Sequence, residues 1–261
     1  MGLYELAFDL DVYHTHAQSE RQEAARRGVG RNCWPIVQDW IMVGTHTPTQ
    51  EVSARMTQRV TLHGISWPTY TCLLAELGDH RASRLAYEQG VLEITMPSDR
   101  HETQKKLLER MIETLTEELN LPAKSFGSTT LNRADLERGA EPDSCYYIQH
   151  VGQIEGRQVD LATDPPPDLI VEVDISSPSS RRIDIYKQLG VPEIWRYSGG
   201  RVQIYRLQDG EYVPCDLSPS FPLVSTAIIN QFLHQAETQD DTSFIRTWRR
   251  WIRQQVSSEP A

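Results

Sequence analysis

The sequence lacks an excess of basic residues, a long apolar run and closely spaced cysteines. Its 261 residues carry a formal net charge of −10 at pH 7. Bulk charge therefore cannot attract nucleic acid, and any nucleic-acid groove has to be local or offset by divalent cations. The apolar runs are too short to cross a bilayer, so we expect no membrane span. The N-terminal residues include acids and no compact apolar core, so we expect no signal peptide.

Cysteine usage excludes two common site classes. The four cysteines, Cys33, Cys72, Cys145 and Cys215, lie far apart, and no pair has the spacing of a zinc knuckle or a redox motif. We therefore expect reduced, mostly buried thiols in a cytoplasmic protein. There is no internal repeat, and the length indicates one domain with additions or two small domains.

The domain organisation follows from where regular patterns begin. Residues 1–55 have no sustained hydrophobic period and are interrupted by glycine and proline. We expect this segment to be a poorly ordered N-terminal extension. We expect residues 56–235 to form the folded domain, and residues 236–261 to form a basic helix and tail.

Regular elements are predicted from Met56 onward. Apolar periods of helical spacing and capping residues predict helices at 66–78, 99–120, 182–189, 225–237 and 241–256. Alternating or branched apolar runs predict strands at 57–62, 84–87, 91–95, 124–131, 144–149, 157–160, 168–175, 193–197 and 202–207. In the 99–120 helix, Asp99 is the expected cap and His101 falls on the core side. Helices both precede and follow the strands, so we predict an α/β fold with a mixed sheet.

The strand at residues 168–174 carries two acids. It reads Asp-Leu-Ile-Val-Glu-Val-Asp, and side chains alternate along a strand, so Glu172 and Asp174 share one face. A charge in a buried strand costs several kcal/mol unless it is paired or binds a metal. Upstream, Asp143 follows Pro142 at the start of another predicted strand. This layout indicates a metal-dependent phosphodiesterase site.

The chemistry explains why these residue types are needed. Phosphodiester hydrolysis requires an activated water and neutralisation of growing negative charge, and a divalent cation supplies both. Mg²⁺ prefers oxygen ligands and retains waters. Asp143 and Glu172 are the expected ligands, with the Val173 carbonyl as a third. Asp174 could add a ligand or raise the pKa of its neighbour.

Each candidate also has a purely structural interpretation. Asp143 could be a turn residue, and Glu172 could simply pair with Arg182. Asp174 could cap a loop. His101 could be a hydrogen-bonded core histidine.

Four blocks in this order resemble a known family. The blocks are Pro142-Asp143, Pro167-Asp168-Leu-Ile-Val-Glu172-Val, Ser177-Pro178-Ser and Leu189-Gly-Val-Pro-Glu193-Ile-Trp. They resemble the Uma-type family of predicted endonucleases in the PD-(D/E)XK superfamily, over roughly residues 57–235. The resemblance implies a restriction-endonuclease-like core, with a mixed central β-sheet flanked by helices.

The resemblance also implies roles for individual residues. Asp143 matches the first acid and Glu172 the second, which implies that both bind Mg²⁺ or Mn²⁺. Asp174 stands where the superfamily lysine is expected, and Arg182, on the following helix, takes the place of the cation. A guanidinium cannot act as a general base, but it can clamp a phosphate. His101 matches the histidine that begins the long helix.

Two further positions match the family. Glu93 matches the acid that ends the hairpin, although a surface carboxylate is the alternative. Tyr186 matches the aromatic residue before Gly-Val-Pro, and packing is its expected role.

The leading hypothesis is a magnesium-dependent endonuclease that hydrolyses DNA. The main alternative is a catalytically impaired nuclease fold that binds nucleic acid or protein. A third hypothesis is an interaction module that forms a homodimer through the Trp195 hairpin. The basic, aromatic segment 246–253 could stack on bases, but we favour packing of Trp248, Trp251 and Ile252 against the body.

Overall fold

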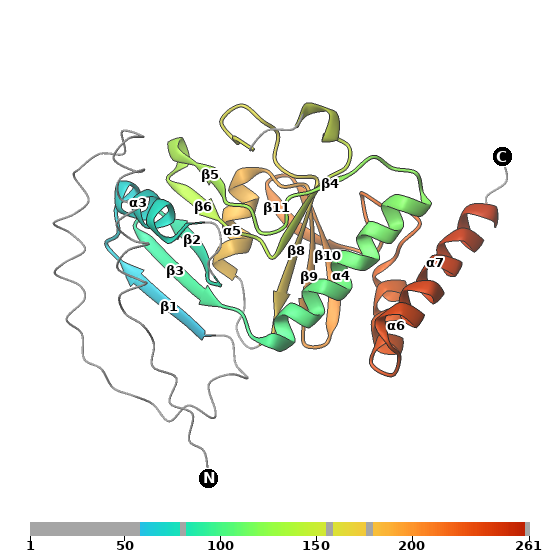
Figure 1. The fold of residues 1–261 in the computed structure, drawn as a ribbon. Helices are drawn as coiled ribbons and strands as arrows, with labels where there is room; N and C mark the ends of the chain where they lie inside the picture. The colour runs from blue at the N-terminus through green and yellow to red at the C-terminus, as the bar shows by residue number, and fades with distance from the viewer. Residues whose placement is uncertain (1–57, 79–81, 155–158, 176–179, 259–261) are drawn as a thin grey trace, which may run out of the picture. The chain divides into compact units, whose positions relative to one another are not determined.

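The structure is a computed structural model that describes residues 58–78, 82–154, 159–175 and 180–258 (Figure 1). The expected N-terminal extension, residues 1–55, lies outside the described residues. The elements that follow form two β-sheets and five helices.

The larger sheet has six strands in the order β11-β10-β9-β8-β7-β4. Their bounds are β4 (Lys124–Ser125), β7 (Ser144–Tyr147), β8 (Leu169–Asp174), β9 (Glu193–Ser198), β10 (Arg201–Gln208) and β11 (Glu211–Cys215). β8 and β9 are parallel, while the other neighbours are antiparallel, so the sheet is mixed as predicted. Helix α5 (Ser180–Leu189) lies between β8 and β9 in the chain, as the connection of a parallel pair requires.

The smaller sheet is antiparallel, in the order β1-β3-β2-β6-β5. Its strands are β1 (Gln58–His63), β2 (Arg84–Glu88), β3 (Val91–Met96), β5 (Leu131–Arg133) and β6 (Arg138–Ala140). Helix α3 (Trp67–Leu77) packs on it through Tyr70, which stacks on Tyr87 of β2 with 4.8 Å between ring centroids. Helix α5 contacts β2 and β6, so it links the two sheets.

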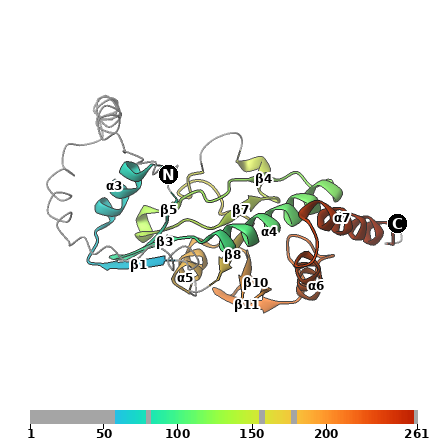
Figure 2. The same cartoon turned by 60° about the horizontal axis from the view of Figure 1, so that its bottom comes forward.

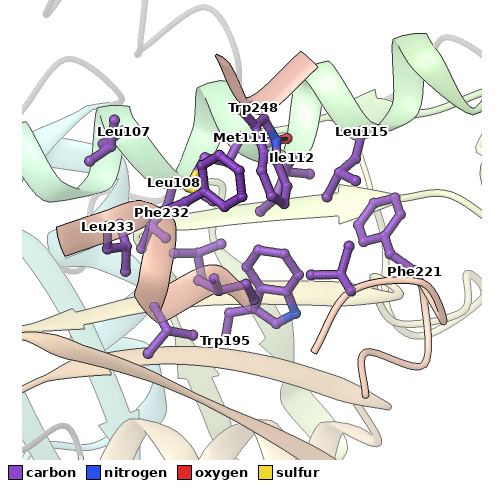
Figure 3. Packing of buried hydrophobic residues seen from close by; sticks show 14 of the residues in the cluster. Leu107, Leu108, Met111, Ile112, Leu115, Trp195, Phe221, Phe232, Leu233 and Trp248 are labelled. Atoms are coloured by element: carbon purple, nitrogen blue, oxygen red, sulfur yellow. Dashed lines mark hydrogen bonds between the residues drawn. The ribbon is translucent and has the colours of Figure 1, made fainter. Parts of the chain in front are cut away.

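Two helices cover one face of the larger sheet, and a third packs against both of them (Figure 1 and Figure 2). They are α4 (Asp99–Glu118), α6 (Thr226–Ala236) and α7 (Asp241–Ser258), and α4 contacts both β8 and α7. Figure 3 shows Leu108 and Ile112 of α4 pointing toward Trp195 of β9, with Trp248 of α7 beside them. This large apolar cluster holds the sheet and the three helices together.

Strand β8 is buried on both faces and divides its side chains between two cores. Leu169, Val171 and Val173 join the cluster beneath α4. Ile170 packs on the opposite face with Ile185 of α5. Because side chains alternate, the acids at even positions of β8 point toward α5. The apolar alternation of this strand therefore decides where the candidate site lies.

Most predicted elements are confirmed, and the exceptions have local causes. The predicted strand 124–131 is wrong, because Gly127 adopts a φ of 56° and separates β4 from β5, which belong to different sheets. The predicted strand 157–160 is not formed at its described residues, because Asp160 builds a turn in which its Oδ1 accepts from Ala162 N at 3.0 Å. Ser98, not Asp99, caps α4. Strands β6 and β11 were not predicted.

Two predictions concern tryptophans. Trp248 and Ile252 of α7 are fully buried, which confirms that this helix packs against the body. Trp195 is also fully buried, and its indole donates to Glu193 Oε1 at 2.7 Å. The Trp195 ring therefore offers no surface to a second copy, and a homodimer through the rest of the hairpin stays a prediction.

The expectation of buried thiols is met only in part. Among the described residues, Cys72, Cys145 and Cys215 form no disulfide, but only Cys145 is buried, while Cys72 and Cys215 are half-buried. In the described ranges, no helix is both long enough and apolar enough to cross a bilayer.

Candidate active site

Asp143 and Glu172 are brought together by two neighbouring strands. The antiparallel register pairs Ser144 with Val171, so the next position places Asp143 opposite Glu172. Both acids have zero exposure. Asp143 Oδ2 accepts a 2.7 Å hydrogen bond from Val173 N, which fixes the carboxylate against β8.

His101 reaches this pair from the first turn of α4. Ser98 Oγ accepts from His101 N at 3.4 Å, and the capped helix carries the imidazole to the sheet. His101 Nε2 lies 3.0 Å from Asp143 Oδ2, and Nδ1 lies 3.4 Å from Glu102 Oε1. His101 is buried, which supports the expectation that it faces the core side.

In the structure, the pKa of His101 is raised and the pKa of Asp143 is lowered. Burial disfavours the imidazolium, but the hydrogen bond to Asp143 and the nearby carboxylates of Asp143 and Glu102 outweigh it and raise the pKa of His101 to about 9. Burial also disfavours the Asp143 carboxylate, but His101 and Arg182 outweigh it and lower its pKa. At neutral pH, the two groups therefore form an ion pair.

Glu172 is held from α5 by two residues one helical turn apart. Tyr186 donates to Glu172 Oε1 at 2.6 Å, and Arg182 Nη2 lies 2.8 Å from Glu172 Oε2. Positions i and i+4 share a helix face, which explains how one short helix supplies both contacts. Arg182 and Tyr186 are buried.

The electrostatic environment of Glu172 opposes its ionisation. Burial raises the pKa of Glu172 to about 8, with Asp143 adding to the rise and Arg182 opposing it. Burial disfavours the Arg182 guanidinium too, but the carboxylates around it raise its pKa. Arg182 thus stays charged and, with the imidazolium of His101, supplies positive charge to the site.

Asp174 shares the α5-facing side with Glu172, but its described contacts are with another residue. Arg196 of β9 approaches Asp174 Oδ2 with both Nε and Nη2 at 2.7 Å. Arg196 was not singled out in the sequence. The pattern that could have identified it is the alternation along β9, where Arg196 follows the buried Trp195. In the parallel register, Arg196 lies opposite Glu172.

Two other acids, Asp168 and Glu93, make contacts that stabilise the fold. Asp168 accepts from Ile148 N at 2.6 Å and from His150 N at 3.1 Å, and also contacts His150 Nδ1. It therefore ties the loop after β7 to the start of β8. Glu93 is buried in β3, with its Oε1 3.4 Å from Arg59 Nε.

Four buried polar atoms of the site accept or donate no hydrogen bond within the described part of the chain. They are Asp143 Oδ1, Glu172 Oε2, His101 Nδ1 and Arg182 Nε. Buried polar atoms are nearly always satisfied, so this concentration at one place calls for an explanation, and a bound ion or water is one such explanation. For Glu172 Oε2, the contact with Arg182 is a close ion pair without hydrogen-bond alignment.

The donor set fits a hard cation. Asp143 Oδ1 and Glu172 Oε2 are carboxylate oxygens, which Mg²⁺ and Mn²⁺ prefer, and Mg²⁺ retains several waters beside one or two such ligands. Among the described residues, no group of three or more His, Cys, Asp or Glu side chains converges on one point. A soft or fully caged metal therefore does not fit, whereas a partly hydrated cation does.

Comparison with known proteins identifies a family for this chain. A search of curated proteins finds no match. The family model "Uma2: Putative restriction endonuclease" matches residues 67–237, which include every residue of the site. The match spans well over half of the chain, and the chain belongs to the Uma2 family.

Proposed function

We propose that this protein is a divalent-cation-dependent endonuclease that hydrolyses phosphodiester bonds of DNA. The observation that carries the proposal is the pair of fully buried acids, Asp143 and Glu172, on adjoining strands. Each presents one oxygen with no hydrogen bond from the described residues. Burying two carboxylates side by side opposes folding, so a catalytic use explains their presence better than stability does.

The residues around the acids have separable tasks in this proposal. Asp143 and Glu172 would hold Mg²⁺ or Mn²⁺, which when bound supplies water activation and charge neutralisation. Arg182 would bind the phosphate, since a planar guanidinium matches two phosphate oxygens and stays protonated. His101 would orient Asp143 through the 3.0 Å contact. Asp174, held by Arg196, would shape the charge around Glu172.

A plasmid-nicking assay tests the proposal. Purified protein is incubated with supercoiled DNA in Mg²⁺, in Mn²⁺ and in excess chelator. We expect nicked or linear product only with metal, and none with Glu172→Gln. Glu76→Gln is the matched control, because Glu76 is an exposed acid on α3 and should leave cleavage unchanged. Cleavage by Glu172→Gln at the wild-type rate would contradict the proposal.

A second candidate is a nuclease fold that binds DNA without cleaving it. It is favoured by the Arg182–Glu172 ion pair, which neutralises an acid that a metal needs, and by the superfamily lysine position being Asp174. This protein would retard DNA on a gel with or without chelator and produce no nicked plasmid. The two candidates therefore predict different outcomes in the same experiment.

A further inference from the structure

The two acids of the site are held in the same way. Asp143 uses Oδ2 to accept from Val173 N at 2.7 Å, and the same oxygen lies 3.0 Å from His101 Nε2. Glu172 uses Oε1 to accept from Tyr186 at 2.6 Å. In each case the second oxygen, Asp143 Oδ1 or Glu172 Oε2, accepts no hydrogen bond from the residues described. In each acid, hydrogen bonds from the protein fix one oxygen and not the other, although Glu172 Oε2 also lies 2.8 Å from Arg182 Nη2.

Tyr186 is placed to act through its hydroxyl group and not through its ring alone. The side chain has zero exposure, and Ile185 and Leu189 already attach α5 to the core around it. A phenylalanine would fill nearly the same volume. The hydroxyl group instead donates to a buried carboxylate, and the orientation of a carboxylate decides which of its oxygens can bind a metal.

The tyrosine is also a neutral donor. Its hydroxyl group donates to Glu172 Oε1 at 2.6 Å without adding a charge to the site. A cationic donor at this place would compete for the carboxylate, whereas a neutral one orients it.

We infer that Tyr186 is a positioning residue that turns Glu172 so that Oε2 faces the cation, as His101 and the Val173 amide do for Asp143. The inference rests on the proposed function and deepens it. Without the hydroxyl group, the Glu172 carboxylate can rotate, and either oxygen can turn to Arg182. Loss of such an outer partner typically costs about 10- to 100-fold in metal affinity.

Titration calorimetry with Mn²⁺ alone tests this inference. We expect Tyr186→Phe to bind Mn²⁺ roughly 10- to 100-fold more weakly than wild type. Tyr212→Phe is the matched control, because it also loses one buried hydrogen bond, the 2.8 Å contact to Val191 O. Burial alone raises the pKa of Tyr212, so no charge of the site acts on it, and its Mn²⁺ affinity should equal that of wild type.

A rescue experiment separates positioning from a structural role. Replacing Tyr186 by 4-aminophenylalanine keeps a neutral donor on the ring and should restore most of the affinity. The half-saturating Mn²⁺ concentration for DNA cleavage should rise in Tyr186→Phe, while turnover at saturating Mn²⁺ recovers. A merely structural role would lower the melting temperature and the saturated rate together. If Tyr186→Phe does not fold, the aminophenylalanine variant still has to bind Mn²⁺ like wild type.

The outcomes distinguish this inference from the proposed function. Equal Mn²⁺ affinity in wild type and Tyr186→Phe would overturn the positioning role and leave the metal site standing. Absence of Mn²⁺ binding by wild type would overturn the metal site and the role of Tyr186 with it.

Discussion

Arg182 places Nη2 2.8 Å from Oε2 of Glu172, and both side chains are buried. A buried ion pair of this kind rarely adds net stability over apolar residues, because desolvation offsets the Coulomb attraction. We therefore propose that the pair is kept for a function. The guanidinium offsets part of the cost of burying Glu172, whose other charged neighbours are the acids Asp143 and Asp174.

Metal binding should depend on both acids. We expect Asp143→Ala and Glu172→Ala each to abolish the rise in melting temperature that Mn²⁺ produces in wild type. At 100 times its dissociation constant, a ligand stabilises a protein by about 2.7 kcal/mol, which is easily measured. In metal-free protein, each variant removes one of two repelling acids but also leaves a buried cation without its partner, His101 in one case and Arg182 in the other, so we expect a net loss of stability. An undiminished Mn²⁺ shift in either variant would exclude the site.

Arg182 should matter more for turnover than for metal affinity. We expect Arg182→Ala to lower the cleavage rate by roughly 100- to 1000-fold, the usual loss for one electrostatic stabiliser. Arg182→Lys should retain part of the rate, because the charge remains while the bidentate geometry is lost. Single-turnover kinetics at saturating Mn²⁺ measure both variants. Equal rates in wild type and Arg182→Ala would show that the cation is structural.

The acids of the site could be predicted from the sequence, because they depend on local alternation. A run of branched residues identifies β8, and period two then assigns Glu172 and Asp174 to one face. The pairing of Glu172 with Arg182 was one interpretation of the sequence, and the structure shows it. The other two partners, Tyr186 and Arg196, could not be predicted from alternation. Tyr186 meets Glu172 only because α5 returns across the sheet, and Arg196 meets Asp174 only through the parallel register of β9. Both are tertiary relationships with no sequence period.

The division of the strands into two sheets could not be predicted from the sequence either. The sequence around 124–131 has strand character throughout, yet the positive φ of Gly127 sends its two ends to different sheets. Strand β11 is short and half-exposed, so it lacks an apolar signal and forms by pairing with β10. Propensity is overridden by pairing at such positions.

Metal-free stability should fall as pH rises from about 6.5 to 9. The pKa of His101 is raised to about 9, so the stability it contributes is present below its unfolded value of 6.5 and is lost through pH 9. The pKa of Glu172 is raised to about 8 from 4.5, so the folded state holds a proton that the unfolded chain has released, and ionisation destabilises the fold. Both effects have the same sign. The lowered pKa of Asp143 acts only in acid.

Urea unfolding at pH 6.5 and pH 9 measures this effect. We expect a loss on the order of 1–3 kcal/mol in wild type, the range that one or two shifted groups produce. His101→Gln and Glu172→Gln should each flatten the dependence, because each removes one of the titrating groups. A wild-type profile that is level across this window would contradict the ionisation states assigned to the site.

The first 55 residues should be dispensable for folding. They lack an amphipathic period, and apolar residues such as Trp34 and Trp40 have no periodic partner face in the sequence. Ordering a residue costs about 1–2 kcal/mol of backbone entropy, which isolated contacts do not offset. A chain that begins at Met56 should melt within a few degrees of the full chain. A drop of more than about 8 °C would mean that the segment packs into the core.

Helix α7 should contribute to stability rather than to nucleic-acid binding. Trp248 is fully buried, stacks on Trp251 at 5.0 Å between ring centroids, and donates its indole N–H to Met111 O of α4 at 3.0 Å. Trp248→Ala should therefore lower the free energy of unfolding by about 3–5 kcal/mol, as expected for a large core aromatic. Arg250→Ala, on the exposed side of the same helix, should change it by less than about 0.5 kcal/mol.

Urea unfolding and DNA gel retardation of Trp248→Ala and Arg250→Ala distinguish a stabilising role of α7 from a role in DNA binding. A helix that stacks bases would keep its tryptophans accessible, and then Trp248→Ala would weaken DNA binding without loss of stability. Because Trp248 is buried against α4, we expect the opposite result, in which Trp248→Ala loses stability first and foremost. Since α4 also carries His101 to Asp143, loosening α7 should shift the imidazole as well, and the Mn²⁺ affinity of Trp248→Ala should fall along with its stability.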